Sequence, residues 1–203
     1  MGNGQHPGPA GTIGGSFPVD DGTLARTSSP PPPPIGLKGG SAKGSEASIA
    51  DQIVAYARQR LGQVVGDGEC FTLVDRALRN AGARSAADFA PVTPDADYEW
   101  GTTVTLSDLR PGDVIQFRDY QCDVETQSRT EVASERQTRP HHTAIVERTG
   151  DHGAVTVLEQ NIPEGTGVTR HVLRFTSGTW SSGVTTTTVQ VQGTFWFYRP
   201  QSR

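Results

Sequence analysis

The chain has 203 residues, a formal net charge of -4 and 33% hydrophobic residues, which fits one folded domain together with polar tails. It contains no long run of lysine and arginine and no basic helix with interleaved aromatic residues, which argues against a nucleic-acid partner. No apolar run approaches the ~18 residues of a membrane-spanning helix. Two cysteines are too few for a disulfide framework.

The first part of the chain is rich in glycine and proline. Residues 1–44 contain 11 Gly and 8 Pro, including the run Pro30–Pro34. Such a composition cannot bury enough apolar surface to offset the entropy lost on ordering, so we predict a disordered leader over residues 1–47. Its proline run is expected to be a stiff spacer, or alternatively a site for an SH3-type protein partner. No stretch typical of a Sec signal peptide opens the sequence, which predicts a cytoplasmic protein, with non-Sec export or release by lysis left open.

Residues 48–203 are predicted to form one domain that begins with helices and continues with strands. Ser48 and Asp51 have the spacing of a capping box, and a stripe of apolar residues extends that helix as far as Gly62. A polar segment without periodicity, residues 118–140, is predicted to be a surface insertion. The predicted strands cover residues 114–117, 142–148, 154–160, 168–175, 185–190 and 194–198, with turns at 150–153 and 178–183. Helices packed on an antiparallel sheet of about five to six strands indicate an α+β fold.

A cysteine at the start of the second predicted helix is the most informative residue of the chain. Apolar residues recur at helical spacing after Cys70, and Gly82 is a natural stop, which predicts a helix over residues 70–81 with Asp67 as its N-cap. Unpaired N–H groups and the helix dipole favour an anion at this position. We therefore expect the pKa of the Cys70 thiol to be lowered toward the reactive thiolate. The alternative is a buried structural cysteine.

A histidine at the start of an apolar strand is the candidate base. His141 and His142 face opposite ways on a strand, and the small Ala144 shares a face with His142, where it lets a helix approach. This favours His142, although a partly buried histidine that caps a strand is the alternative. The remaining histidines and cysteines lack the spacing of metal ligands, so we expect neither a metal nor a cofactor.

The group that orients the imidazole depends on the register of the next hairpin. A turn at 150–153 places His142 opposite residue 159 or 160. With Glu159 opposite His142, Asn161 lies diagonally beside it on the same face, and these two residues orient the ring. A register one residue away selects Gln160 instead.

Other residues near the cysteine are candidates for the substrate site. The backbone N–H of Cys70 is expected to bind an oxyanion, with Gln63 in the preceding loop as a side-chain donor. Trp100 is expected to line a substrate groove, or alternatively to close the core. Glu69 borders the thiol, and its negative charge opposes thiolate formation. Cys122 lies among charged residues and is expected to be an exposed thiol that does not pair with Cys70.

The order of these motifs resembles that of the CHAP amidohydrolase/peptidases, papain-like enzymes that mostly cut peptidoglycan cross-bridges or amide bonds. The similar segments are Cys70 at a helix start, Arg110–Phe117, His142–Val146 and Leu158–Asn161. The resemblance covers roughly residues 48–199 and implies Cys70 as nucleophile and His142 as base, with Glu159 and Asn161 completing the site. The chain departs from that family at Glu69, where many members carry glutamine, and it lacks the Asp-x-Asp calcium loop, so no calcium is expected.

A second resemblance rests on Arg139–Val146 and Trp196–Pro200. These segments are similar to the cysteine-proteinase-fold domain that ends certain fungal actin-patch, myosin-interacting adaptors, and the Pro-rich leader would fit an adaptor. Together the motifs predict a monomeric, thiol-dependent hydrolase that cuts amide or peptide bonds, in peptidoglycan stem peptide or protein, through a Cys–His acyl-enzyme. The alternative is a catalytically inactive papain-fold module that binds a protein partner.

Overall fold

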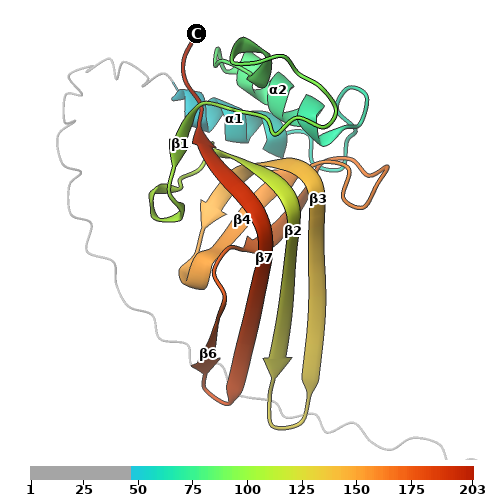
Figure 1. Cartoon of the computed structure of the whole chain (residues 1–203), viewed down its shortest axis with the longest axis vertical. Helices are drawn as coiled ribbons and strands as arrows, with labels where there is room; N and C mark the ends of the chain where they lie inside the picture. The colour runs from blue at the N-terminus through green and yellow to red at the C-terminus, as the bar shows by residue number, and fades with distance from the viewer. Residues whose placement is uncertain (1–46) are drawn as a thin grey trace, which may run out of the picture. The chain divides into compact units, whose positions relative to one another are not determined.

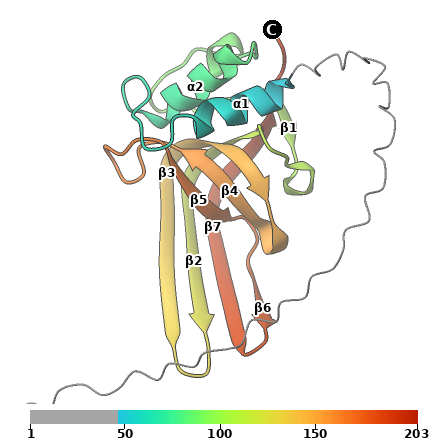
Figure 2. The ribbon, with the colours of Figure 1, turned by 180° about the vertical axis from the view of Figure 1, so that it is seen from behind.

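The computed structural model describes residues 47–203, so the predicted leader lies outside the described residues except for Ala47. Figures 1 and 2 show two helices across one end of a sheet whose longest strands run far beyond them. The helices are α1 (Ile49–Arg58) and α2 (Cys70–Asn80), with 3-10 turns η1 (Ala86–Asp88), η2 (Leu106–Asp108) and η3 (Asp151–Gly153). The strands are β1 (Thr102–Val104), β2 (Val114–Gln127), β3 (Val132–Thr149), β4 (Ala154–Glu159), β5 (Thr169–Arg174), β6 (Gly178–Ser182) and β7 (Thr185–Arg199).

The first helix begins at the predicted capping box. The Ser48 hydroxyl accepts a hydrogen bond from the Asp51 N–H (3.1 Å), and the Asp51 carboxylate accepts one from the Ser48 N–H (3.3 Å), which satisfies two otherwise unpaired donors. The helix ends at Arg58, and Gly62 follows in the left-handed region with φ of 77°. The buried residues of α1 are Ile53, Val54 and Ala57, which form the expected apolar stripe.

The second helix begins at Cys70, as predicted, but its N-cap differs. The N-cap residue is Glu69, whose side chain makes no capping hydrogen bond, so the prediction of Asp67 at this position is wrong. The Asp67 carboxylate instead accepts a hydrogen bond from the Glu69 N–H (3.1 Å), one residue short of the helix. Four apolar residues of α2 are completely buried, which fixes the helix against the sheet: Leu73, Val74, Ala77 and Leu78.

The sheet has seven antiparallel strands, which confirms the α+β class and exceeds the expected five to six. The path is β1-β7-β2-β3-β4-β5, and β6 pairs with β7. Two sequence predictions are corrected here. The predicted turn at 178–183 contains β6, and the two predicted strands at 185–190 and 194–198 are one strand. The short strand β1 at residues 102–104 was not predicted. Gly193 lies inside that strand with φ of 92° and faces an irregularity in β2 near Asp119, so the chain passes the glycine without turning.

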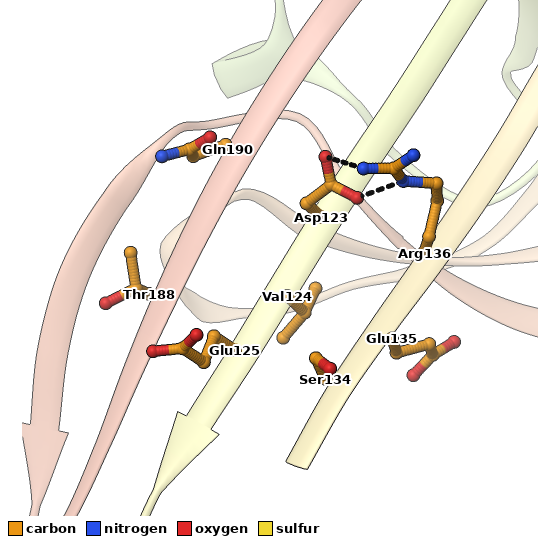
Figure 3. Close-up of a pocket in the computed structure, with 8 residues that line it drawn as sticks. All are labelled: Asp123, Val124, Glu125, Ser134, Glu135, Arg136, Thr188 and Gln190. Atoms are coloured by element: carbon orange, nitrogen blue, oxygen red, sulfur yellow. Dashed lines mark hydrogen bonds and ion pairs between the residues drawn. The ribbon is translucent and has the colours of Figure 1, made fainter. Parts of the chain in front are cut away.

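The predicted insertion at 118–140 is built from regular strands. The β2–β3 pairing continues from Val114↔Ile145 as far as Gln127↔Val132, and β7 pairs with the other side of β2. On β2, Tyr120, Cys122 and Val124 alternate with polar residues and face the core, so the prediction of a segment without periodicity is wrong there. The outer part of β3 is exposed and polar, and it shows no such alternation. Figure 3 shows part of this extension, where Arg136 of β3 pairs with Asp123 of β2 (Nε to Oδ1, 2.5 Å) beside an open polar pocket.

The core consists of two apolar clusters. One lies between the helices and the sheet, where Leu73 of α2 meets Ile145 and Leu158. The other consists of residues from the strands and their connections, including Phe117 and Leu173. The first cluster fixes the start of α2 against β3 and β4, and this contact brings the candidate site residues together.

Candidate active site

Cys70 occupies the first position of α2 and is half-buried. The Glu69 carbonyl accepts hydrogen bonds from the N–H groups of Thr72 (3.1 Å) and Leu73 (3.4 Å), one turn further along. Burial alone would raise the pKa of the thiol. The interaction with His142 and the backbone N–H groups of Thr143 and Phe71 outweigh burial, so the pKa of Cys70 is lowered from its ordinary value.

His142 lies between the thiol and a carboxylate, and it is 4% exposed. Its Nε2 lies 3.0 Å from Oε2 of Glu159, which is an ion-pair contact. The ring N–H is not aligned for a hydrogen bond to this oxygen. Burial by itself lowers the pKa of this imidazole. The neighbouring Cys70 and Glu159 outweigh that effect and raise the pKa of His142 to about 9. A protonated imidazole beside a thiol of lowered pKa is the arrangement of a thiolate–imidazolium pair.

Glu159 is completely buried and is surrounded by three cationic or titratable partners. Arg139 donates from Nε to Oε2 (2.9 Å) and from Nη2 to Oε1, and His171 Nδ1 lies 2.7 Å from Oε1. Burial opposes ionisation, but His142, His171 and Arg139 together hold the pKa of this carboxyl well below its usual range. The lowered pKa favours an ionised carboxylate behind the histidine.

The register of β3 and β4 explains how Glu159 reaches His142. Ile145 pairs with Leu158, so the sequence prediction that placed Glu159 directly opposite His142 has the wrong register. Continued toward His142, this pairing sets Glu159 opposite Ala144, diagonally across from the imidazole and on the same face. The predicted shared face is therefore retained even though the direct pairing is not.

Gln160 holds the loop that precedes α2. It is completely buried, its Oε1 accepts from the Val65 N–H (2.6 Å), and its Nε2 donates to the carbonyls of Val65 (3.1 Å) and Glu69 (2.9 Å). These three bonds tie the end of β4 to the residue immediately before Cys70. The side chain thus supports the position of the nucleophile and does not orient the imidazole.

Replacing Gln160 with alanine is expected to lower the free energy of unfolding by about 3 kcal/mol, since three buried backbone groups lose their partner. Urea unfolding followed by circular dichroism measures this change. The matched control is Gln190→Ala on the exposed face of β7, for which a change within about 0.5 kcal/mol is expected. Equal effects of the two substitutions would contradict the anchoring role of Gln160.

Asn161 and Glu69 contact one another rather than the imidazole. Asn161 has a positive φ of 71°, its Oδ1 accepts from the Gly165 N–H (2.6 Å), and its Nδ2 donates to Oε2 of Glu69 (3.3 Å). The expectation that Asn161 orients the ring is therefore not reflected in its contacts. Glu69 is exposed beside the thiol, as the sequence order requires.

The predicted substrate residues have mixed outcomes. Gln63 is exposed in the loop before α2, where its carbonyl accepts from the Val168 N–H (2.8 Å). Trp100 is completely buried and donates from Nε1 to Gln116 Oε1 (3.2 Å), so it closes the core and the groove-lining expectation is wrong. Its indole packs against Phe71 at a centroid distance of 5.3 Å, which supports the first turn of α2.

The chain as a whole matches a known family of domains. The family model described as the AIM3/BBC1 Cysteine proteinase-fold domain matches residues 25–202, which is most of the sequence. The chain belongs to this family. No match was found among curated proteins or among solved structures. The AIM3/BBC1 domain has the cysteine-proteinase fold that both resemblances implied, whereas membership of the CHAP enzymes remains an expectation.

Three residues of this AIM3/BBC1 domain lie at the site although the sequence did not single them out. Arg139 and His171 bind Glu159. Tyr98 lies near Cys70, and the pKa of the Tyr98 phenol is raised, first by burial and then by the charge of Cys70. Arg139 lies only three residues before His142, but its charge gave no sign that it is buried. His171 comes from β5, and only the β4–β5 pairing brings it to the carboxylate.

Some expected features concern other parts of the domain. Cys122 is completely buried and is a free thiol, so the prediction of an exposed thiol is wrong, and burial raises its pKa. Within residues 47–203, no cluster of three or more His, Cys, Asp or Glu side chains is placed to hold a metal ion. In the same part of the chain, no helix combines the length and apolar character needed to cross a membrane.

Proposed function

We propose that this domain is a thiol-dependent hydrolase of amide or peptide bonds. The proposal rests on three neighbouring side chains: Cys70 interacts with His142, and His142 contacts Glu159. The imidazole is buried and the thiol is half-exposed. A nucleophile, a base and a group that holds the base are the minimum for covalent catalysis by cysteine. The lowered pKa of Cys70 and the raised pKa of His142 both favour the charged pair.

The reaction proceeds through an acyl-enzyme. The Cys70 thiolate attacks the carbonyl carbon, a C–S bond forms, and the electron pair of the carbonyl moves to oxygen, where the N–H at the start of α2 is the proposed donor. Collapse of this intermediate breaks the C–N bond, and the departing amine takes the proton of the His142 imidazolium. Neutral His142 then removes a proton from water, which attacks the thioester and releases the acid and the thiol group.

The substrate class follows from the proposed chemistry and the family resemblances. A peptide bond in protein and an amide bond in peptidoglycan stem peptide both offer a carbonyl to the thiolate. Incubation of the full chain with a fluorogenic peptide library and with purified peptidoglycan tests the two sources, and Cys70→Ala is the control in each. Release of product that the control lacks is the expected result. Absence of turnover on both substrates, in a folded chain whose Cys70 thiol is accessible, would contradict the proposal of a hydrolase.

The second candidate function is a non-catalytic module that binds a protein partner. The observation in its favour is the carboxylate of Glu69, which lies exposed beside Cys70 and opposes a thiolate there. A partner contact through the Pro-rich leader belongs to this candidate, although the leader lies outside the described residues. The monomeric state, the cytoplasmic location and the absence of a nucleic-acid partner remain predictions in either case.

Glu69→Gln separates the two candidates. Removal of the negative charge is expected to lower the pKa of Cys70 in either case, and if the domain is a hydrolase, turnover near neutral pH is retained or increased. If the domain only binds, the substitution leaves turnover absent and changes the affinity for the partner.

A further inference from the structure

A group of arginines lies outside the proposed active site, at the end of α1. Arg58 of α1, Arg148 of β3 and Arg170 of β5 line one open pocket together with the carboxylate of Glu147. One carboxylate against three guanidinium groups leaves an excess of positive charge, although the whole chain is acidic. None of these residues takes part in the proposed hydrolysis.

Glu147 holds two of the arginines in place. Its side chain is 6% exposed, its Oε1 accepts from Arg58 Nε (2.7 Å) and Arg170 Nη2 (2.7 Å), and its Oε2 accepts from Arg170 Nε (2.5 Å). Both arginines bind this carboxylate while about half of each side chain remains exposed. The buried carboxylate therefore fixes two guanidinium groups that still present N–H donors to solvent.

The backbone of β3 is irregular at Glu147. The β3–β4 register shifts between Val146 and Arg148, so Glu147 is the extra residue of a bulge. A bulge changes the direction in which neighbouring side chains project, and bulges are common next to functional sites. Arg148 donates from Nη2 to the Thr156 hydroxyl (3.3 Å). Within residues 47–203, neither Nη group of Arg58 makes a hydrogen bond, and Arg170 Nη1 makes none either.

A second pocket continues from the arginines along α1. It shares Arg58 and Glu147 with the first pocket, and its remaining lining residues are Asp51, Val54, Ala55, Gln59 and Pro111. Ala55 and Pro111 are the exposed apolar residues among them. An anionic group in the arginine pocket would therefore have a partly apolar groove beside it. This combination suits a charged residue that is presented by a peptide chain.

We propose that this surface binds a phosphorylated serine or threonine of a peptide, with the phosphate among Arg58, Arg148 and Arg170 and the adjacent peptide residue over Ala55 and Pro111. A phosphate monoester carries close to two negative charges and accepts the paired N–H donors that arginine offers. The cluster is a compact pocket and not a broad basic face, and the chain has a net charge of -4, so a peptide is favoured over an anionic membrane.

NMR titration of the full chain tests this proposal. The probe is the pentapeptide Ala-Ala-phosphoSer-Ala-Ala, compared with the same peptide carrying serine, with inorganic phosphate, and with phosphatidylserine vesicles. We expect the phosphopeptide to shift the side-chain signals of Arg58 and Arg148 and the backbone signals of Ala55. It should bind at least about tenfold more tightly than the serine peptide, as charge-assisted bonds imply. Inorganic phosphate is expected to compete with it.

Two variants define the outcome. Arg148→Gln and Arg58→Gln are each expected to weaken phosphopeptide binding about tenfold, whereas Arg129→Gln, which makes the same charge change at the β2–β3 turn, leaves it unchanged. Thermal unfolding confirms that each variant is folded. Equal binding of the two peptides, equal effects of the three substitutions, or binding to vesicles without binding to the phosphopeptide would overturn the proposal.

Discussion

Replacing Glu159 with leucine is expected to lower the free energy of unfolding by about 3–5 kcal/mol, because Arg139 then remains buried with no counter-charge. Both side chains are almost completely removed from solvent, at 4% and 0% exposure. His142 and His171 also lose the carboxylate that lies beside both rings. Chemical denaturation of the purified chain measures the change.

The matched double variant makes this prediction specific. Arg139→Met together with Glu159→Leu replaces the buried ion pair with apolar side chains, which is often close to neutral for stability. We therefore expect the double variant to recover most of the stability lost in Glu159→Leu. A double variant whose loss equals the sum of the two single losses would show that the two side chains do not stabilise the domain as a pair.

His142 is the proposed proton carrier of the reaction, and its loss is expected to have a large effect on catalysis. His142→Ala is expected to lower kcat/KM by a factor of about 10²–10⁴, the contribution of a general base, measured on a peptide that the library identifies as a substrate. Two consequences add here: the amine loses its proton donor, and burial of Cys70 is no longer offset by the imidazolium. Cys70→Ala is expected to remove turnover completely.

A histidine elsewhere in the domain controls for this substitution. His152 is exposed in η3 and stacks on Trp180 at a centroid distance of 4.5 Å. His152→Ala is therefore expected to leave kcat/KM within about twofold of the native value, since surface changes away from a site have small effects. A loss of turnover in His152→Ala that equals the loss in His142→Ala would remove His142 from the proposed mechanism.

Local patterns predict the parts of this domain that depend on nearby residues. The capping box, the helical spacing after Cys70 and the apolar run after His142 are visible in short windows of sequence, and the structure has helices or a strand at these places. The N-cap at Asp67 failed because the side-chain preference at a cap does not tell at which residue the helix starts. The helix begins after Glu69.

Features that depend on long-range pairing could not be predicted in the same way. The outer part of β3 lacks apolar alternation because it is mostly exposed, although it pairs with β2 as far as Val132. The register that places Glu159 diagonally from His142 depends on the bulge at Glu147, which moves the pairing by one residue. Arg139 and His171 reach the carboxylate only once β3, β4 and β5 are assembled. Trp100 shows that an aromatic residue next to glycine does not by itself indicate a groove.

The rate of Cys70 alkylation by iodoacetamide as a function of pH shows whether Cys70 and His142 form an activated thiolate–imidazolium pair. Mass spectrometry assigns the modified residue, and His142→Ala is the control. Only the thiolate reacts, so a lowered pKa moves the rise in rate to lower pH. We predict a Cys70 pKa below the ordinary value of about 8.5 that rises in His142→Ala, where only the backbone N–H groups of Thr143 and Phe71 still oppose burial. A pKa at or above that ordinary value, and unchanged by the substitution, would contradict the account.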